Sequence, residues 1–422
     1  MLDRTLSPSY YSPEFKNIPL PERAVLNSGV NIYSFNNDDQ KVFKIELNFG
    51  VGSNILNNPA IASLCVPMLR EGSSTKSATE ISNILDYYGA FLDLKSGLEN
   101  TIISLYGRSK FINELIPLLA DIIKNPIFDE TALSKHKLKM SQKLSIDQQK
   151  TSYWSPRLLR QNIFGSDHPN SRFISEEKIE KITRNDLVGF HKGYLLKRLQ
   201  NIIIAGFFDS NVVVAQLQEH FKVINNAGKH EDKIPLSSEN TKEVTKKLSN
   251  TNQASIALGL GAIGIKNPDY PEYAFLTKVL GGYFGSRLMK TLREEEGLTY
   301  GIHAYNIHLM SGSYLQISAD VELKSVDKSI ELIHNEIDNL NRNLIPINEL
   351  ETVKNYMLGE YVNDSNTIFD FADLYKKLLV HGLPESYYQD FYSKISSVEA
   401  ETLLANSNNY FKIDDFSQVK VI

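Results

Sequence analysis

Hydrophobic and polar residues alternate along Val42–Phe49, which predicts a strand with one buried face. An apolar helix is expected next, over residues 59–70. Ser77 and Glu80 have the spacing of a capping box and predict the start of a second helix, which Gly89 would close. Its apolar face consists of Ile81, Ile84, Leu85 and Tyr88.

Two further alternating runs, 90–95 and 101–106, are separated by a short segment that contains Gly97 and predicts a β-hairpin. A third helix follows. Its apolar residues are Phe111, Leu115, Leu118 and Ile122. The first half of the chain therefore has the order strand, helices, hairpin, helix.

The second half of the chain repeats this order. A strand is expected at 253–260, and helices are expected at 273–280 and 286–295, the latter closed by Gly297. The runs 300–309 and 313–323 alternate around a Ser-Gly turn and predict another hairpin. An amphipathic helix comes last in this series. Its apolar positions are Val326, Ile330, Ile333, Ile337 and Leu340.

The repeated order favours a tandem duplication, with Tyr88-Gly89 and Tyr300-Gly301 at corresponding places. Two unrelated α+β domains that are alike by chance are the alternative. We expect an N-terminal domain at 1–225, a polar linker at 226–247 and a C-terminal domain at 248–422. The predicted fold class is α+β: two tandem homologous domains, each with a mainly antiparallel sheet and flanking helices.

Composition narrows the functional classes. The 422 residues carry a net charge of −5, which offers no basic field for nucleic acid or an anionic membrane. No apolar run approaches the length of a membrane span, and the first residues lack the apolar core of a secretory signal. The single cysteine excludes an internal disulfide and a cysteine-based zinc site. A cytoplasmic location is expected, and a periplasmic one stays open.

An ordered set of motifs resembles peptidase family M16, the family of insulinase and the mitochondrial processing peptidases. The motifs lie at 69–74, 88–90, 164–169, 182–191, 201–209 and, most closely matched, 280–300. The resemblance covers nearly the whole chain. It implies the M16 metallopeptidase fold in both halves.

The zinc motif of that family, His-x-x-Glu-His, is absent from this chain. Ser63, Val66 and Pro67 occupy its three functional positions, and the residues near the expected third ligand, 141–143, include no carboxylate. A hydroxyl is a poor zinc ligand, and neither valine nor proline has a donor atom. No two of the nine histidines stand three or four residues apart, so no alternative helical zinc site is expected. The chain is expected to hold no metal of its own.

One functional feature of the family is present. The resemblance implies that Arg293 and Tyr300, seven residues apart, reach substrate at a zinc site across a chamber. A phenol can donate to an oxyanion and a guanidinium can hold carbonyl groups, whereas the simpler alternative is a surface charge and a residue that begins a strand. Gly89, Ala90, Phe91 and Leu92 are the expected edge for binding a peptide by strand addition.

These observations lead to one hypothesis and two alternatives. The chain would be the non-catalytic subunit of a heterodimeric M16 zinc peptidase, with no peptidase activity alone. The expected partners are a catalytic subunit that carries His-x-x-Glu-His and its zinc, and peptide substrates; a homodimer of the isolated chain stays open. The alternatives are a scaffold or assembly protein, and a peptidase with an unrecognised metal site.

Overall fold

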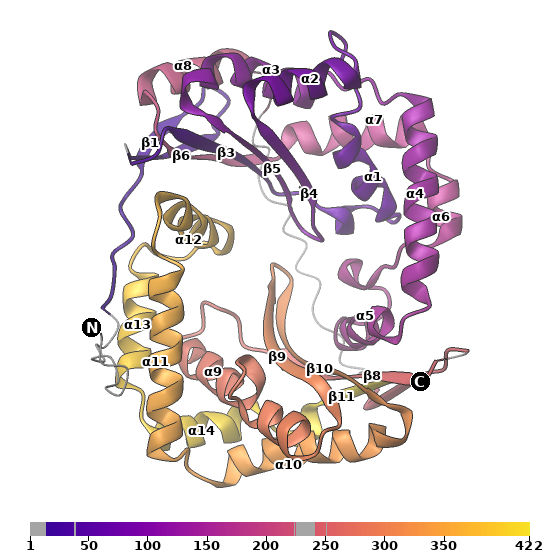
Figure 1. The fold of residues 1–422 in the computed structure, drawn as a ribbon, viewed down its shortest axis with the longest axis vertical. Coiled ribbons are helices and arrows are strands. Elements are labelled where there is room, and N and C mark those ends of the chain that lie inside the picture. The colour runs from indigo at the N-terminus through magenta and orange to yellow at the C-terminus, as the bar shows by residue number, and fades with distance from the viewer. Residues whose placement is uncertain (1–13, 38, 223, 225–240, 250) are drawn as a thin grey trace, which may run out of the picture.

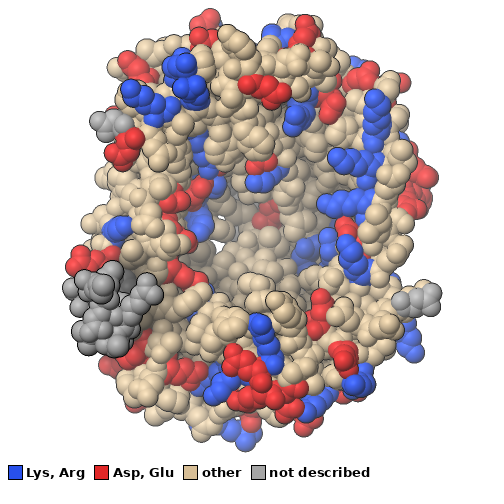
Figure 2. Space-filling model, in the orientation of Figure 1, with Lys and Arg blue, Asp and Glu red and all other residues tan. Residues whose placement is uncertain are grey.

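The computed structural model describes residues 14–422 except 38, 223, 225–240 and 250. These residues form two β-sheets, each with helices packed on it, and the two halves enclose a central space (Figure 1). Figure 2 shows that this face of the molecule is hollowed between the halves. No helix among the described residues is both long enough and apolar enough to cross a bilayer.

The first sheet has the strand order β1-β2-β6-β3-β5-β4. Its strands are β1 (Glu22–Val25), β2 (Asn31–Asn36), β3 (Val42–Phe49), β4 (Phe91–Ser96), β5 (Thr101–Arg108) and β6 (Leu199–Gly206). The β2–β6 pair is parallel and the other pairs are antiparallel. The predicted strand at Val42–Phe49 and the hairpin of β4 and β5 are confirmed.

The second sheet repeats this arrangement without an equivalent of β1. Its order is β7-β11-β8-β10-β9, and only the β7–β11 pair is parallel. The strands are β7 (Glu243–Lys246), β8 (Gln253–Ala262), β9 (Thr299–Leu309), β10 (Gly312–Glu322) and β11 (Ser417–Val421). The α+β class and two similar, mainly antiparallel domains are confirmed. Most of the expected linker, 225–240, lies outside the described residues, and its end forms strand β7.

The first half supplies eight α-helices among the described residues. They are α1 (Ala60–Met68), α2 (Ala78–Tyr88), α3 (Ile112–Lys124), α4 (Glu130–Gln148), α5 (Thr151–Phe164), α6 (Glu176–Glu180), α7 (Arg184–Gly193) and α8 (Ser210–His220). The predicted capping box forms at α2: the Ser77 hydroxyl accepts from the Glu80 amide, and the Glu80 carboxylate accepts from the Ser77 amide. Gly89 ends this helix in the left-handed conformation.

The second half contains α9 (Tyr270–Thr277), α10 (Val326–Arg342), α11 (Ile347–Asn363), α12 (Ile368–His381), α13 (Tyr387–Ser397) and α14 (Ala400–Tyr410). The five predicted apolar positions of α10 are buried. The helices expected at 273–280 and 286–295 differ from the prediction, because π-helical segments occupy Lys278–Gly282 and Met289–Glu295. Gly281 leaves helical geometry where β9 comes close: a Cβ there would lie 2.9 Å from the Ala304 Cβ.

Each half of the chain packs one of its helices on the sheet of the other half. Helix α5 of the first half packs on the second sheet, where its buried residues Leu159, Ile163 and Phe164 meet Ala257, Tyr314 and Val419. In the other direction, α12 packs on the first sheet. Its residues Ala372, Tyr375 and Leu378 bury Phe35, Ile203 and Ala205. Each half therefore completes the core of the other, and the halves cannot separate without exposing apolar surface.

A network of charges also joins α12 to β3. The Lys44 ammonium lies 3.0 Å from Glu46 and 2.8 Å from Asp373, while Lys376 lies 3.0 Å from Glu46 and 2.8 Å from Asp373. Lys44 and Glu46 are buried on the sheet. Burial opposes the charge of Lys44, but the two carboxylates outweigh burial and raise its pKa. The two positive charges of the lysines and the two negative charges of the carboxylates cancel, so the network carries no net charge.

Candidate functional site

Helix α1, which carries the positions of the absent zinc motif, is a packing helix. The Ser63 hydroxyl donates to the carbonyl of Pro59 at 3.2 Å, Val66 is fully buried and Pro67 lies inside the helix. Cys65 is buried with its thiol 3.6 Å from the carbonyl of Leu187, and burial raises the pKa of this thiol. The side chains that would face a metal are thus an internally bonded hydroxyl and apolar groups.

Helix α4 packs beside α1 and contains the region of the expected third ligand. Gln142 and Lys143 are exposed there. A histidine–carboxylate pair does lie between the end of α1 and α4, with His136 Nε2 3.1 Å from Glu71 Oε1. Within the described part of the chain, however, no cluster of three or more histidine, cysteine, aspartate or glutamate side chains could hold a metal ion.

We expect the purified chain to contain well under one zinc per molecule, because Ser63, Val66 and Pro67 offer no set of ligands. Elemental analysis of metal-equilibrated, dialysed protein measures this directly. Stoichiometric zinc that is lost when His136 or Glu71 is replaced would contradict this expectation and favour a peptidase with an unrecognised metal site.

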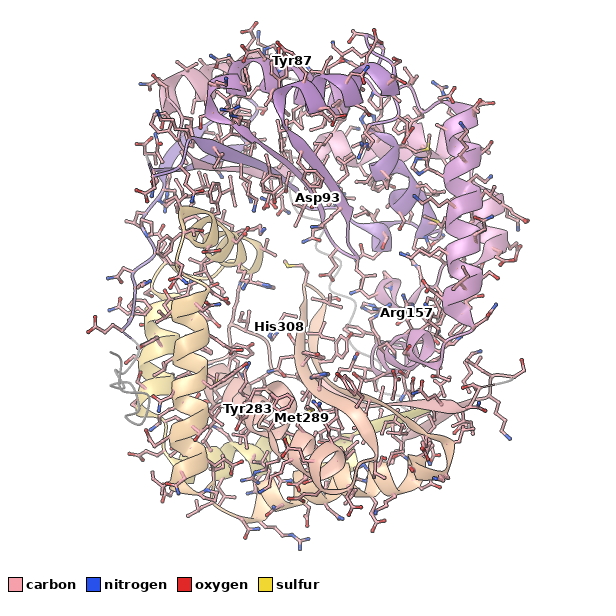
Figure 3. All side chains as sticks on the ribbon, in the orientation of Figure 1. Tyr87, Asp93, Arg157, Tyr283, Met289 and His308 are labelled. Carbon is pink, nitrogen blue, oxygen red and sulfur yellow. The ribbon has the colours of Figure 1, made fainter. Side chains whose placement is uncertain are left out.

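Strand β4 forms one edge of the first sheet, since β5 is its only partner among the described strands. The edge available for strand addition is shorter than the sequence predicts. Gly89 has a φ of 59°, and the amides of Gly89 and Ala90 already donate to carbonyls of α2. The strand begins at Phe91, which is 61% exposed, whereas Leu92 is buried. Figure 3 shows Asp93 of this strand beside the central space.

Arg293 and Tyr300, the two residues that the sequence motif singles out, lie together. The Arg293 guanidinium carbon is 5.0 Å from the centre of the Tyr300 ring and 4.8 Å from the centre of the Phe284 ring. Tyr300 is 89% exposed and Phe284 is 62% exposed. Sequence reasoning missed Phe284: it lies within the matched stretch 280–300, but a spacing of nine residues from Arg293 does not predict a contact.

A β-bulge explains why Tyr300 projects so far from the sheet. Ile302 pairs with Ala319 and Thr299 pairs with Val321, so Tyr300 and Gly301 together face the single residue between those partners. The Thr299 hydroxyl fixes the bulge, because it donates to the Asp320 carbonyl at 2.7 Å and accepts from the Gly301 amide at 3.2 Å. The extra residue turns Tyr300 away from the core.

The phenol of Tyr300 makes no hydrogen bond to any described residue. It is therefore available to donate to a group outside the chain, while Arg293 supplies a positive charge beside it. No metal-ligating cluster lies among the described residues to complete a hydrolytic site. The arrangement of Arg293 and Tyr300 can stabilise negative charge.

Comparison with protein families matches residues 32–172 to "Insulinase (Peptidase family M16)" and residues 181–357 to "Peptidase M16 inactive domain". The chain belongs to peptidase family M16. It is an M16 homologue whose first domain lacks the residues of the family's zinc site.

Named relatives and solved structures agree with this assignment. The "Non-peptidase homolog YmxG" of Helicobacter pylori is 25% identical over 371 residues, which cover 86% of this M16 chain and 84% of that protein. A crystal structure of a peptidase M16 inactive domain from Pseudomonas fluorescens aligns with a TM-score of 0.85 and 21% identity, covering 95% of this chain and 98% of that one. A chain in Complex III2 from Candida albicans aligns with a TM-score of 0.77 and 20% identity over 95% of both chains. These structural likenesses show the fold.

Proposed function

We propose that this M16 chain is the non-catalytic subunit of a heterodimeric zinc peptidase. It would line half of a peptide chamber and present Arg293 and Tyr300 to a zinc site held by its partner. The partner would be an M16 chain with the intact His-x-x-Glu-His motif and bound zinc. The observation that carries the proposal is the exposed phenol of Tyr300, which no described residue hydrogen-bonds, fixed by a bulge and flanked by Arg293, in a structure whose described residues include no metal-ligating cluster.

The chemistry supports this division of work. Hydrolysis of a peptide bond passes through a tetrahedral oxyanion, which donors placed in advance stabilise. A zinc site in the partner would supply the activated water, and Tyr300 would supply one donor to the oxyanion. Arg293 would hold a substrate carbonyl. The free edge of β4 from Phe91 onward would bind the extended peptide by strand addition.

Replacing Arg293 with alanine tests the proposal, with peptide hydrolysis by the chain reconstituted with a zinc-bearing M16 subunit as the assay. We expect kcat/KM to fall about tenfold to a hundredfold, because a hydrogen bond to a charged group contributes about 1.5–3 kcal/mol. KM should rise, since the guanidinium positions substrate. Arg342→Ala is the control, because Arg342 is exposed on α10 and pairs only with Asp338 in the described structure. Size-exclusion chromatography verifies assembly.

A role as a scaffold or assembly protein is the second candidate. The likeness to a chain of Complex III2 favours it, because the same fold there occurs within a complex. In this case Arg293→Ala would leave hydrolysis unchanged in every pair tested, and the chain would still assemble.

A further inference from the structure

A cavity of about 400 Å³ lies at the end of the first sheet that is remote from the second half. It is bordered by the start of β3, the ends of β5 and β6, and the first turns of α3 and α8. The other ends of β3 and β5 lie at the β4–β5 turn, where Glu99 accepts a hydrogen bond from Ser311 of the second half at 3.2 Å. The eight residues of β3 therefore place about 24 Å of strand between the cavity and that contact. Neither Arg293 nor Tyr300 lines the cavity.

The main chain holds the cavity wall that follows β6 in place. Gly206 has a φ of 121°, and a Cβ there would lie 2.1 Å from the carbonyl oxygen of Val42, so glycine is required where these strands meet. The Phe207 amide donates to the same carbonyl at 3.0 Å. The side chain of Asn36 donates to the Phe208 carbonyl at 2.6 Å. The wall is thus formed before any ligand binds.

This wall presents apolar side chains to solvent. Phe207 is 39% exposed and Val212 is 42% exposed. The remaining apolar residues of the lining are buried, namely Ile112, Phe208 and Val213. Large apolar side chains that are exposed in a concave surface are typical of binding sites. The cavity therefore offers a contact for an apolar group of a ligand.

Three basic side chains line the same cavity: Lys41, Arg108 and Lys110. All three are exposed, and none makes an ion pair or a side-chain hydrogen bond with a described residue, although the Lys110 ammonium lies 4.5 Å from the centre of the Phe111 ring. Asp209 is the one carboxylate among the lining residues, and it accepts from two main-chain amides at the start of α8, at 2.9 and 3.2 Å. Figure 2 shows basic side chains gathered at this corner of the first half, beside α8 of Figure 1. Positive charge therefore dominates the cavity.

Charge and shape together select the ligand. Cations that converge without partners repel one another, and an anionic ligand removes this repulsion. A free phosphate ion would meet the cations but leave the apolar wall exposed. An anionic membrane is a poor match, because the surface is concave and the chain carries a net charge of −5. An acidic segment that contains an apolar residue matches both parts of the cavity.

We propose that this cavity docks an acidic segment of a partner protein, with carboxylates on either side of an aromatic or large aliphatic residue. The apolar residue would pack against Phe207 and Val212, and the carboxylates would pair with the three basic side chains. Because Arg293 and Tyr300 lie elsewhere, such a partner can dock whether or not a substrate is held there. The inference goes beyond the proposed function and does not depend on it.

Calorimetric titration of the full chain with acetyl-Glu-Asp-Phe-Asp-Glu-amide, up to millimolar concentration, tests the inference. We expect Lys41→Gln, Arg108→Gln and Lys110→Gln each to weaken binding about threefold, the effect of one exposed ion pair. The three changes together should weaken it on the order of thirtyfold, because independent effects add as free energies. Phe207→Ala should weaken binding about fivefold, since part of an apolar contact is lost. Added salt should also weaken binding, because it screens exposed charges.

A variant with three lysines of α4 replaced, Lys135→Gln/Lys139→Gln/Lys143→Gln, is the matched control. It removes the same number of positive charges from exposed positions that do not line the cavity. Its affinity for the peptide should equal that of the wild type. Thermal melting verifies that every variant is folded.

Four results would overturn the inference. They are no binding of the acidic peptide to the wild-type chain, equal affinity in the triple cavity variant and the wild type, an equal loss in the α4 control, and undiminished binding of the peptide with alanine in place of its phenylalanine. The last result would mean a general anion site, which inorganic phosphate would also fill. None of these measurements uses a zinc-bearing subunit, so failure here is distinct from failure of the proposed function.

Discussion

Replacing Tyr300 with phenylalanine is expected to slow peptide hydrolysis by the reconstituted pair on the order of a hundredfold or more. The substitution removes one hydroxyl and keeps the ring that stacks beside Arg293. Loss of one oxyanion donor typically costs about 3–4 kcal/mol of transition-state stabilisation. The effect should fall on kcat, because the donor acts where charge develops rather than in substrate binding. Steady-state kinetics with a fluorogenic peptide measures it.

Tyr305→Phe is the matched control for this prediction. Tyr305 lies on the same strand, is half exposed and stacks on His303, yet it is outside the bulge. Its hydroxyl can be removed with little expected change in kcat. Equal and small effects of the two substitutions would mean that Tyr300 does not reach the reacting group.

Replacing Glu46 with alanine is expected to destabilise the fold by about 3 kcal/mol. Glu46 is buried between two ammonium groups, Lys44 and Lys376, at 3.0 Å from each. Removing it leaves both charges with Asp373 as their remaining partner in the described network, and losing one member of a buried ion pair costs about 3–5 kcal/mol. The partial exposure of Lys376 and Asp373 places the expected value at the lower end of that range.

Urea unfolding of both proteins measures this difference. Glu177→Ala is the control, because the side chains of Glu177 and its partner Lys181 are both exposed, and an exposed pair contributes about 0–1 kcal/mol. A change for Glu46→Ala no larger than for this control would show that α12 is held on the first sheet by its apolar face alone.

Local patterns predicted most of the secondary structure because they depend on neighbouring residues. The alternation at Val42–Phe49, the capping box at Ser77 and the apolar stripe of α10 each reflect one element and its nearest contacts. The exchange of α5 and α12 was not predictable in this way. The periodicity of a helix shows which face is buried but not which sheet buries it. The π-helical segments likewise depend on how closely β9 approaches Gly281.

The candidate site, like the fold, was predictable from the sequence only in part. The resemblance to the family singled out Arg293 and Tyr300, but the bulge that exposes Tyr300 depends on the pairing register with β10, which the pattern of β9 alone does not define. The predicted peptide edge began two residues early, because Gly89 and Ala90 finish α2. A separate cavity between the halves is lined by Asn48 of β3 and Gln200 of β6, which are far apart in sequence, and no local motif indicates it.

The most direct test of the central claim compares peptide hydrolysis by a zinc-bearing M16 partner in three states. The partner is assayed alone, with the wild-type chain, and with the Arg293→Ala/Tyr300→Phe double variant, and size-exclusion chromatography confirms that both pairs assemble. The account predicts that the wild-type chain restores hydrolysis and that the double variant assembles but stays near the rate of the partner alone. Full activity with the double variant would contradict it and leave the chain as a scaffold.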